Sequence, residues 1–75
     1  MTYRIESADG RVMAAGKTFG DLEAAIEAGK TVIRRSLSNR RAHGTAAVDV
    51  VEMIPGRYTT RAIVNPDLTV TRKGA

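Results

Sequence analysis

The sequence predicts an α+β fold, in which a single helix packs on a mostly antiparallel sheet with the element order β-β-α-β-β-β. Two observations predict this fold. Residues 18–37 place their apolar side chains at intervals of three or four residues, the spacing of one face of a helix. The segments on both sides alternate instead between apolar and polar residues, the spacing of half-buried strands. Residues 1–75 are expected to form one small domain.

A β-hairpin is expected at the start of the chain. Residues 3–7 alternate between apolar and polar side chains, and Asp9-Gly10 is a dipeptide typical of two-residue hairpin turns, because both of its residues tolerate positive φ. Pairing across this turn sets Ile5 opposite Ala14 and keeps the apolar residues of both strands on the same face.

The predicted helix spans residues 18–37. Thr18 is the expected N-cap, and Asp21 is the expected acidic half of a capping box. Gly29 falls on the apolar stripe and costs about 1 kcal/mol relative to alanine. Close approach of the helix to a strand would explain this glycine, and so would a second chain filling the notch. The large apolar residues of the stripe are Phe19, Leu22, Ile26, Ile33 and Leu37.

A polar loop at residues 38–45 and three further strands complete the predicted fold. The strands are expected at residues 46–54, 58–64 and 68–72, with Leu68 and Val70 entering the core. A three-residue loop at 55–57 keeps the apolar residues of the first two strands on one face. The pairs it predicts are Val48–Val64, Val50–Ala62 and Ile54–Tyr58. A two-residue loop would set Arg61 beside Val50 and mix the faces, so the three-residue loop is expected.

Length and composition argue against several classes of protein. A chain of 75 residues buries only about 60 % of its unfolded surface, which leaves little room for a large pocket and a catalytic apparatus. The chain has no cysteine, which favours a reduced, cytoplasmic setting. No apolar run reaches the roughly 18 residues that span a bilayer, and no signal peptide precedes the first strand, so no membrane partner is expected.

Motifs that resemble catalytic sites lack their context. The tripeptide Gly-Lys-Thr occurs at residues 16–18 and 29–31, but a P-loop needs four residues between its glycines, and residues 10 and 16 enclose five. His43 is the only histidine, so a zinc site would lack ligands. Asp49 and Glu52 fall on opposite faces of one strand and do not form an acid/base pair. No enzyme activity, cofactor or metal is expected.

The net charge of +4 is concentrated in one region. No acidic residue occurs between Ala28 and Val48, whereas the rest of the chain is close to neutral. Regional clusters of this kind are typical of proteins with an anionic partner. The same charges also suit the negative end of the helix dipole, or solubility alone. The candidate partner-binding residues are Lys30, Arg34, Arg35, Arg40, Arg41, His43, Arg57 and Arg61.

Two classes of partner fit this basic patch. The first is an acidic protein surface or a nucleoprotein complex, bound by a non-enzymatic module such as a phage or mobile-element inhibitor or accessory protein. The second is the phosphate backbone of DNA or RNA, which would make binding steeply dependent on salt. Tyr3 and Phe19 are expected in the core, so only Tyr58 is left for base stacking. Open sheet edges and Gly29 also permit a homodimer.

Residues 5–26, IESADGRVMAAGKTFGDLEAAI, resemble the hairpin-then-helix start of HicB-type antitoxins. The resemblance implies a third alternative, an antitoxin-like regulatory protein. It covers under a third of the chain, which lacks the Pro- and Cys-containing segment of that family. No residue roles are therefore transferred.

Overall fold

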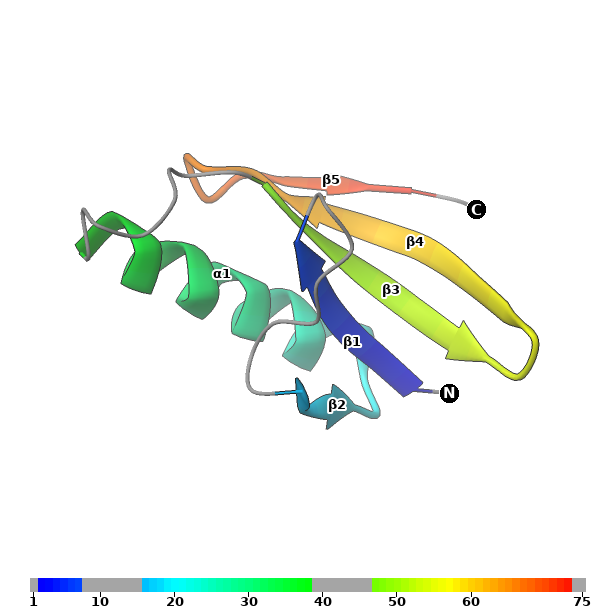
Figure 1. The fold of residues 1–75 in the computed structure, drawn as a ribbon. Helices are drawn as coiled ribbons and strands as arrows, with labels where there is room; N and C mark the ends of the chain where they lie inside the picture. The colour runs from blue at the N-terminus through cyan, green and yellow to red at the C-terminus, as the bar shows by residue number, and fades with distance from the viewer. Residues whose placement is uncertain (1, 8–15, 39–46, 74–75) are drawn as a thin grey trace.

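The computed structural model describes residues 2–7, 16–38 and 47–73, without the side chains of residues 36–38. It confirms the α+β fold: helix α1 (Leu22–Ser38) packs on a five-stranded antiparallel sheet (Figure 1). The sheet order is β2-β1-β3-β4-β5, so the first and third strands along the chain are neighbours in its middle. The strands are β1 (Thr2–Ser7), β2 (Thr18–Phe19), β3 (Val48–Ile54), β4 (Arg57–Val64) and β5 (Val70–Arg72).

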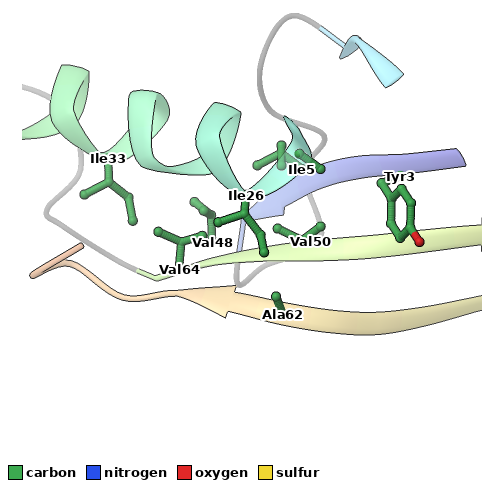
Figure 2. Packing of buried hydrophobic residues seen from close by; sticks show 9 residues of the cluster. Tyr3, Ile5, Ile26, Ile33, Val48, Val50, Ala62 and Val64 are labelled. Atoms are coloured by element: carbon green, nitrogen blue, oxygen red, sulfur yellow. The ribbon is translucent and has the colours of Figure 1, made fainter. Parts of the chain in front are cut away.

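The core is one layer of aliphatic side chains between α1 and the sheet. Ile26 and Ile33 of the helix are 2 % and 1 % exposed and lie over the strands (Figure 2). Burying each such side chain contributes about 1.5–3 kcal/mol. The residues of the core cluster are Tyr3, Ile5, Ala25, Ile26, Ile33, Val48, Val50, Ala62 and Val64. Ala25 was not part of the predicted stripe but is also buried, because a helix this close to the sheet covers the small residue next to Ile26 as well.

Gly29 marks the point of closest approach between α1 and the sheet. A Cβ atom at this position would lie 3.0 Å from Val64 Cγ2 and 3.3 Å from Val48 Cγ2. Both distances are tighter than ordinary van der Waals contact, so the missing side chain is what allows the helix to sit on these valines. The first of the two predicted explanations for Gly29 is confirmed.

The predicted start of the helix at Thr18 is wrong. Thr18 and Phe19 form the short strand β2, in which Phe19 lies opposite Tyr3 of β1. From this strand Phe19 packs against the core, and Leu22 packs against it from the first turn of the helix. Phe19 thus reaches the core without an extra helical turn, and its spacing from Leu22 fits both arrangements.

The helix is capped by Asp21. Asp21 Oδ1 accepts a hydrogen bond from the backbone N–H of Glu23 at 3.2 Å, and the Asp21 carbonyl accepts the N–H of Ala25 at 3.1 Å. This is the N-cap geometry, in which a side-chain oxygen satisfies an N–H that the helix leaves unpaired. Asp21 therefore has the capping role that the sequence pattern had given to Thr18.

The predicted alternation of β1 is confirmed, and the structure pairs this strand with β3. Tyr3 and Ile5 are buried, their neighbours are partly exposed, and Ile5 lies opposite Val50 of β3. The Asp9-Gly10 turn and the pairing of Ile5 with Ala14 lie outside the described residues, as does most of the loop predicted at 38–45.

The β3–β4 hairpin combines both registers that the sequence allows. Val48 lies opposite Val64 and Val50 opposite Ala62, as the three-residue loop predicts. Near the turn the pairs are Met53–Tyr58 and Ile54–Arg57, as a two-residue turn requires, so the predicted pairing of Ile54 with Tyr58 is wrong. A β-bulge between these regions absorbs one extra residue of β4, Arg61. The bulge lets the turn stay tight while Ala62 and Val64 stay in the core.

The last strand is shorter than predicted. After the expected turn at residues 65–67, Leu68 has a positive φ of 70° and its N–H donates to the Asn65 carbonyl at 2.8 Å. Strand β5 then begins at Val70, opposite Val64. Leu68 and Val70 both pack against the core, which confirms the prediction for their side chains.

Candidate partner-binding site

Two residues of the predicted basic patch, Arg34 and Arg35, lie near the C-terminal end of α1. Arg34 and Arg35 are exposed there, whereas Ile33 beside them is buried against the sheet. Because successive helical residues are about 100° apart, the packing of Ile33 turns both arginines toward solvent. Arg35 makes no ion pair with any described residue. The carbonyl end of the helix dipole favours positive charge at this position.

Lys30 lies in the middle of α1, one turn before Arg34, and is partly neutralised. Its Nζ lies 3.1 Å from Glu27 Oε2, one turn earlier on the helix. The Lys30 side chain is 25 % exposed, so an external anion reaches it less easily than it reaches the arginines. We call Lys30, Arg34 and Arg35 the basic helix end. Arg40, Arg41 and His43 follow in the sequence but lie outside the described residues.

Arg57 and Arg61 do not join the basic helix end. Arg57 begins β4, directly after the β3–β4 turn, and that turn and the C-terminal end of α1 lie at opposite ends of the molecule (Figure 1). Arg61 is the bulged residue, and its Nε lies 3.7 Å from Oε1 of the buried Glu52. The sequence shows the charges of Arg57 and Arg61 but not their distance from the basic helix end. That distance depends on how the hairpin packs relative to the helix, which is a tertiary property.

Sequence reasoning missed a surface at the turn of this hairpin. Ile54 is 39 % and Tyr58 61 % exposed, and they are the only large exposed hydrophobic residues in the described part of the chain. The guanidinium carbon of Arg4 lies 4.7 Å from the centre of the Tyr58 ring, a cation–π contact. The sequence feature that could have indicated this surface is the two-residue turn at Pro55-Gly56, because its register places Tyr58 on the face of the sheet away from the helix.

Two carboxylates lie close together on the face of the sheet that points away from the helix. Asp49 of β3 is directly opposite Glu6 of β1. Burial, followed by the negative charge of Glu6, raises the pKa of Asp49, while Lys73 acts in the other direction. Arg4 Nε lies 2.6 Å from Glu6 Oε2 and offsets part of the repulsion. This group of residues is an internal charge network and offers no free basic surface.

The described residues hold no cluster suited to a metal or to acid/base catalysis. No group of three or more His, Cys, Asp or Glu side chains could bind an ion in the described part of the chain. The strand register confirms that Asp49 and Glu52 lie on opposite faces, since they pair with Glu6 and with the buried Tyr3. That the protein is not an enzyme stays a prediction. Within residues 2–7, 16–38 and 47–73, no helix is long and apolar enough to cross a membrane.

Comparisons with known proteins give no family. No protein-family model, no curated protein and no solved structure matches the chain. The resemblance of residues 5–26 to HicB-type antitoxins gains no support from them. What the protein does is therefore inferred from its own residues.

Proposed function

We propose that this protein is a non-enzymatic binding module that docks through its basic helix end on an acidic protein surface. The observation that carries the proposal is the exposure of Arg34 and Arg35 on the last turns of α1, within a stretch of sequence that has no acidic residue from 28 to 48. An acidic surface of a nucleoprotein machine, the target of a phage or mobile-element inhibitor, is one partner of this kind. A chain without cysteine suits a reduced cytoplasmic setting.

The chemistry of the exposed side chains supports a protein partner. A guanidinium group pairs with a carboxylate through two parallel hydrogen bonds, and arginine is enriched among the residues that dominate interface energies. Arg4 and Arg72 are engaged in ion pairs inside the protein, with Glu6 and Glu23. Arg34 and Arg35 are both exposed and adjacent in the sequence, so together they can meet an external carboxylate.

A nucleic-acid backbone is the second candidate partner, because the same acid-free stretch suits phosphates. The placement of the aromatic residues argues against single-strand binding at this end. Tyr3 is buried and Phe19 packs against the core. Tyr58 is the second residue of β4, beside the β3–β4 turn, and this turn lies at the opposite end of the molecule from the C-terminal end of α1 (Figure 1). A DNA or RNA ligand at the basic helix end would therefore be held by phosphate contacts without base stacking from any described aromatic ring.

The test compares two charge reversals of equal size. The double variant Arg34→Glu/Arg35→Glu changes the basic helix end, and Lys17→Glu/Lys73→Glu changes two exposed lysines elsewhere. Each protein is titrated with immobilised peptides rich in Glu and Asp, and with random duplex DNA, single-stranded DNA and RNA at two salt concentrations. Adding Arg40→Glu and Arg41→Glu to the arginine variant extends the test to the rest of the patch.

The proposal predicts that wild-type protein binds the acidic peptides and that the arginine variant loses about tenfold or more in affinity. The lysine variant is expected to keep most of its binding, and circular dichroism is expected to be native in all proteins. Equal losses in the two variants would contradict a specific site. Binding of nucleic acid with a steep salt dependence, and none of the acidic peptides, would favour the second candidate.

A further inference from the structure

We infer that the end of the β3–β4 hairpin is a second docking surface, built for a protein partner that offers an apolar recess flanked by carboxylates. The surface, called here the hairpin tip, consists of Ile54, Arg57 and Tyr58 around the turn Pro55-Gly56. The hairpin projects beyond the first turn of α1, so the helix does not cover the tip (Figure 1). This inference is independent of the proposed role of the basic helix end.

The hairpin tip exposes apolar area on both faces of the sheet. Ile54 pairs with Arg57, while Tyr58 pairs with Met53, so Ile54 and Tyr58 point to opposite sides. Their exposed fractions are 39 % and 61 %, although both are residue types that usually lose water contact on folding. A partner that buries both side chains must enclose the tip, which requires a recess and not a flat surface.

The tyrosine is held in place before a partner arrives. Arg4 of β1, which is separated from β4 by β3, lies over its ring at 4.7 Å, and Glu6 fixes Arg4 through a 2.6 Å contact to Nε. The turn itself is tight, because Gly56 takes the positive φ of 76° that it needs. An aromatic side chain that is already oriented loses little conformational entropy on binding, and tyrosine is among the commonest anchors of protein interfaces.

The accessible charge at the hairpin tip is positive. Arg57 is exposed and makes no ion pair with a described residue. The acidic residue of the same hairpin closest to it in sequence, Glu52, is 4 % exposed and faces Arg61. Charge complementarity therefore specifies carboxylates around the recess.

The same charge argues against other occupants. A symmetric dimer through the hairpin tip would bring two copies of Arg57 into one small interface, where their like charges would repel. A nucleic-acid strand would stack on Tyr58 but would leave Ile54 without an apolar partner. An acidic protein with an apolar recess satisfies all three side chains of the tip.

The experiment uses a panel of immobilised synthetic peptides of three kinds: acidic residues with Leu and Trp, acidic residues with Gly and Ser, and Leu and Trp with Gly and Ser. Wild-type protein is compared with Ile54→Ser/Tyr58→Ser, with Arg57→Glu, and with Arg34→Glu/Arg35→Glu as the matched control from the basic helix end. Thermal unfolding checks that each variant is folded, which the exposure of the changed side chains favours.

Wild type is expected to bind the acidic-apolar peptides about tenfold more tightly than the purely acidic ones. Ile54→Ser/Tyr58→Ser should abolish this preference, Arg57→Glu should weaken binding to the same peptides, and Arg34→Glu/Arg35→Glu should keep the preference. The inference is overturned if wild type shows no preference or if the preference survives the tip variants. It is also overturned if wild type binds oligothymidylate and Ile54→Ser/Tyr58→Ser abolishes that binding, or if wild type is a dimer in sedimentation and the same variant dissociates it. Loss of binding to purely acidic peptides in the Arg34→Glu/Arg35→Glu variant tests the basic helix end alone, so the two proposals can fail separately.

Discussion

Gly29 sets the distance between α1 and the sheet at the scale of one residue. A Cβ atom there would lie 3.0 Å from Val64 Cγ2, inside a core that is close-packed. A larger side chain must push the helix away from β3 and β4. We expect Gly29→Val to lower the free energy of unfolding by about 1–3 kcal/mol, the usual cost of overpacking.

Gly20→Val is the matched control for this substitution. A Cβ atom at Gly20 would meet nothing within 4 Å, so its effect is expected to stay within about 0.5 kcal/mol. Denaturant unfolding of both variants gives the comparison. Equal stability of the two variants would contradict the close approach and would leave the notch at Gly29 open to another chain.

The start of the helix gives a second prediction at the residue scale. Asp21 Oδ1 accepts the backbone N–H of Glu23 at 3.2 Å, whereas Thr18 lies in β2. We expect Asp21→Ala to lower the free energy of unfolding by about 1 kcal/mol and Thr18→Ala to cost less, with Asp21→Asn close to wild type because asparagine also caps. Urea titration measures all three. A larger loss of unfolding free energy for Thr18→Ala than for Asp21→Ala would instead favour the longer predicted helix, with Thr18 as its N-cap.

Elements were predicted better than their ends. The helical stripe of Ile26, Gly29 and Ile33 appears in the sequence because its period is local. The identity of the residue that caps the helix is less local, since Phe19 is compatible with a helix turn and with a strand beside Tyr3. Tertiary pairing selects the strand, which no property of residues 18–21 alone reveals.

The β3–β4 hairpin shows the same limit at the scale of register. Apolar alternation correctly paired Val48 with Val64, because the core fixes which side chains face the helix. The tight turn at Pro55-Gly56 fixes the pairs at the other end independently. One extra residue then has to be absorbed in between, and the bulge at Arg61 absorbs it. A single uniform register could satisfy only one of these demands, so the prediction placed Tyr58 on the wrong face.

The pairing of β1 with β3 gives a prediction about pH. Asp49 lies opposite Glu6, and burial and this like charge raise the pKa of Asp49 in the folded protein above its value of 3.8. The folded state therefore binds a proton more tightly than the unfolded state, and stability falls as the pH rises from 3.8 through the raised pKa. We expect Asp49→Asn to stabilise the protein at neutral pH by about 0.5 kcal/mol, a gain that disappears toward pH 3.8.

Asp67→Asn is the control for this prediction, because its expected effect on stability at neutral pH is opposite to that of Asp49→Asn. Hydrogen bonds from the hydroxyl and the backbone N–H of Thr69 lower the pKa of Asp67. Its charged form therefore stabilises the fold above pH 3.8, and this contribution is lost as the pH falls through the lowered pKa. Asp67→Asn should destabilise the protein at neutral pH, and denaturant unfolding across this range checks both variants. If the free energy of unfolding of Asp49→Asn and of wild type changed in parallel with pH, the raised pKa of Asp49 would be refuted.

At the scale of the whole molecule, the sequence could locate the basic charges along the chain but not in space. Arg34 and Arg35, which were named as candidate partner-binding residues, are exposed because helical periodicity places them away from the buried stripe. Arg57 was grouped with them, although it begins β4 at the β3–β4 turn, which lies at the other end of the molecule from the C-terminal end of α1 (Figure 1). Only the sheet order and the direction of the hairpin determine that separation, and both arise from long-range pairing. The molecule, with a longest dimension of 36 Å, therefore has two basic surfaces and not one patch.

One ion pair ties the first turn of α1 to the last strand, across 49 residues of sequence. Arg72 donates to both carboxylate oxygens of Glu23, at 2.7 and 3.0 Å, and these hydrogen bonds are the main cause of the lowered pKa of Glu23. Because both side chains of the pair are more than half exposed to solvent, it is expected to hold β5 in place more than to decide global stability. Arg72→Glu should therefore speed amide hydrogen exchange at Lys73, whose N–H donates to the Arg61 carbonyl at 2.8 Å.

The charge swap Glu23→Arg/Arg72→Glu tests the pair directly. It should recover part of the exchange protection that Arg72→Glu loses, but not all, because arginine in the first helical turn opposes the helix dipole. In the wild type the contribution of the pair is present above pH 4.5 and is lost as the pH falls through the lowered pKa of Glu23, so Arg72→Gln and wild type should converge in acid. If the swap protects Lys73 no better than Arg72→Glu alone, β5 is held by its strand pairing and by the burial of Leu68 and Val70, without help from this ion pair.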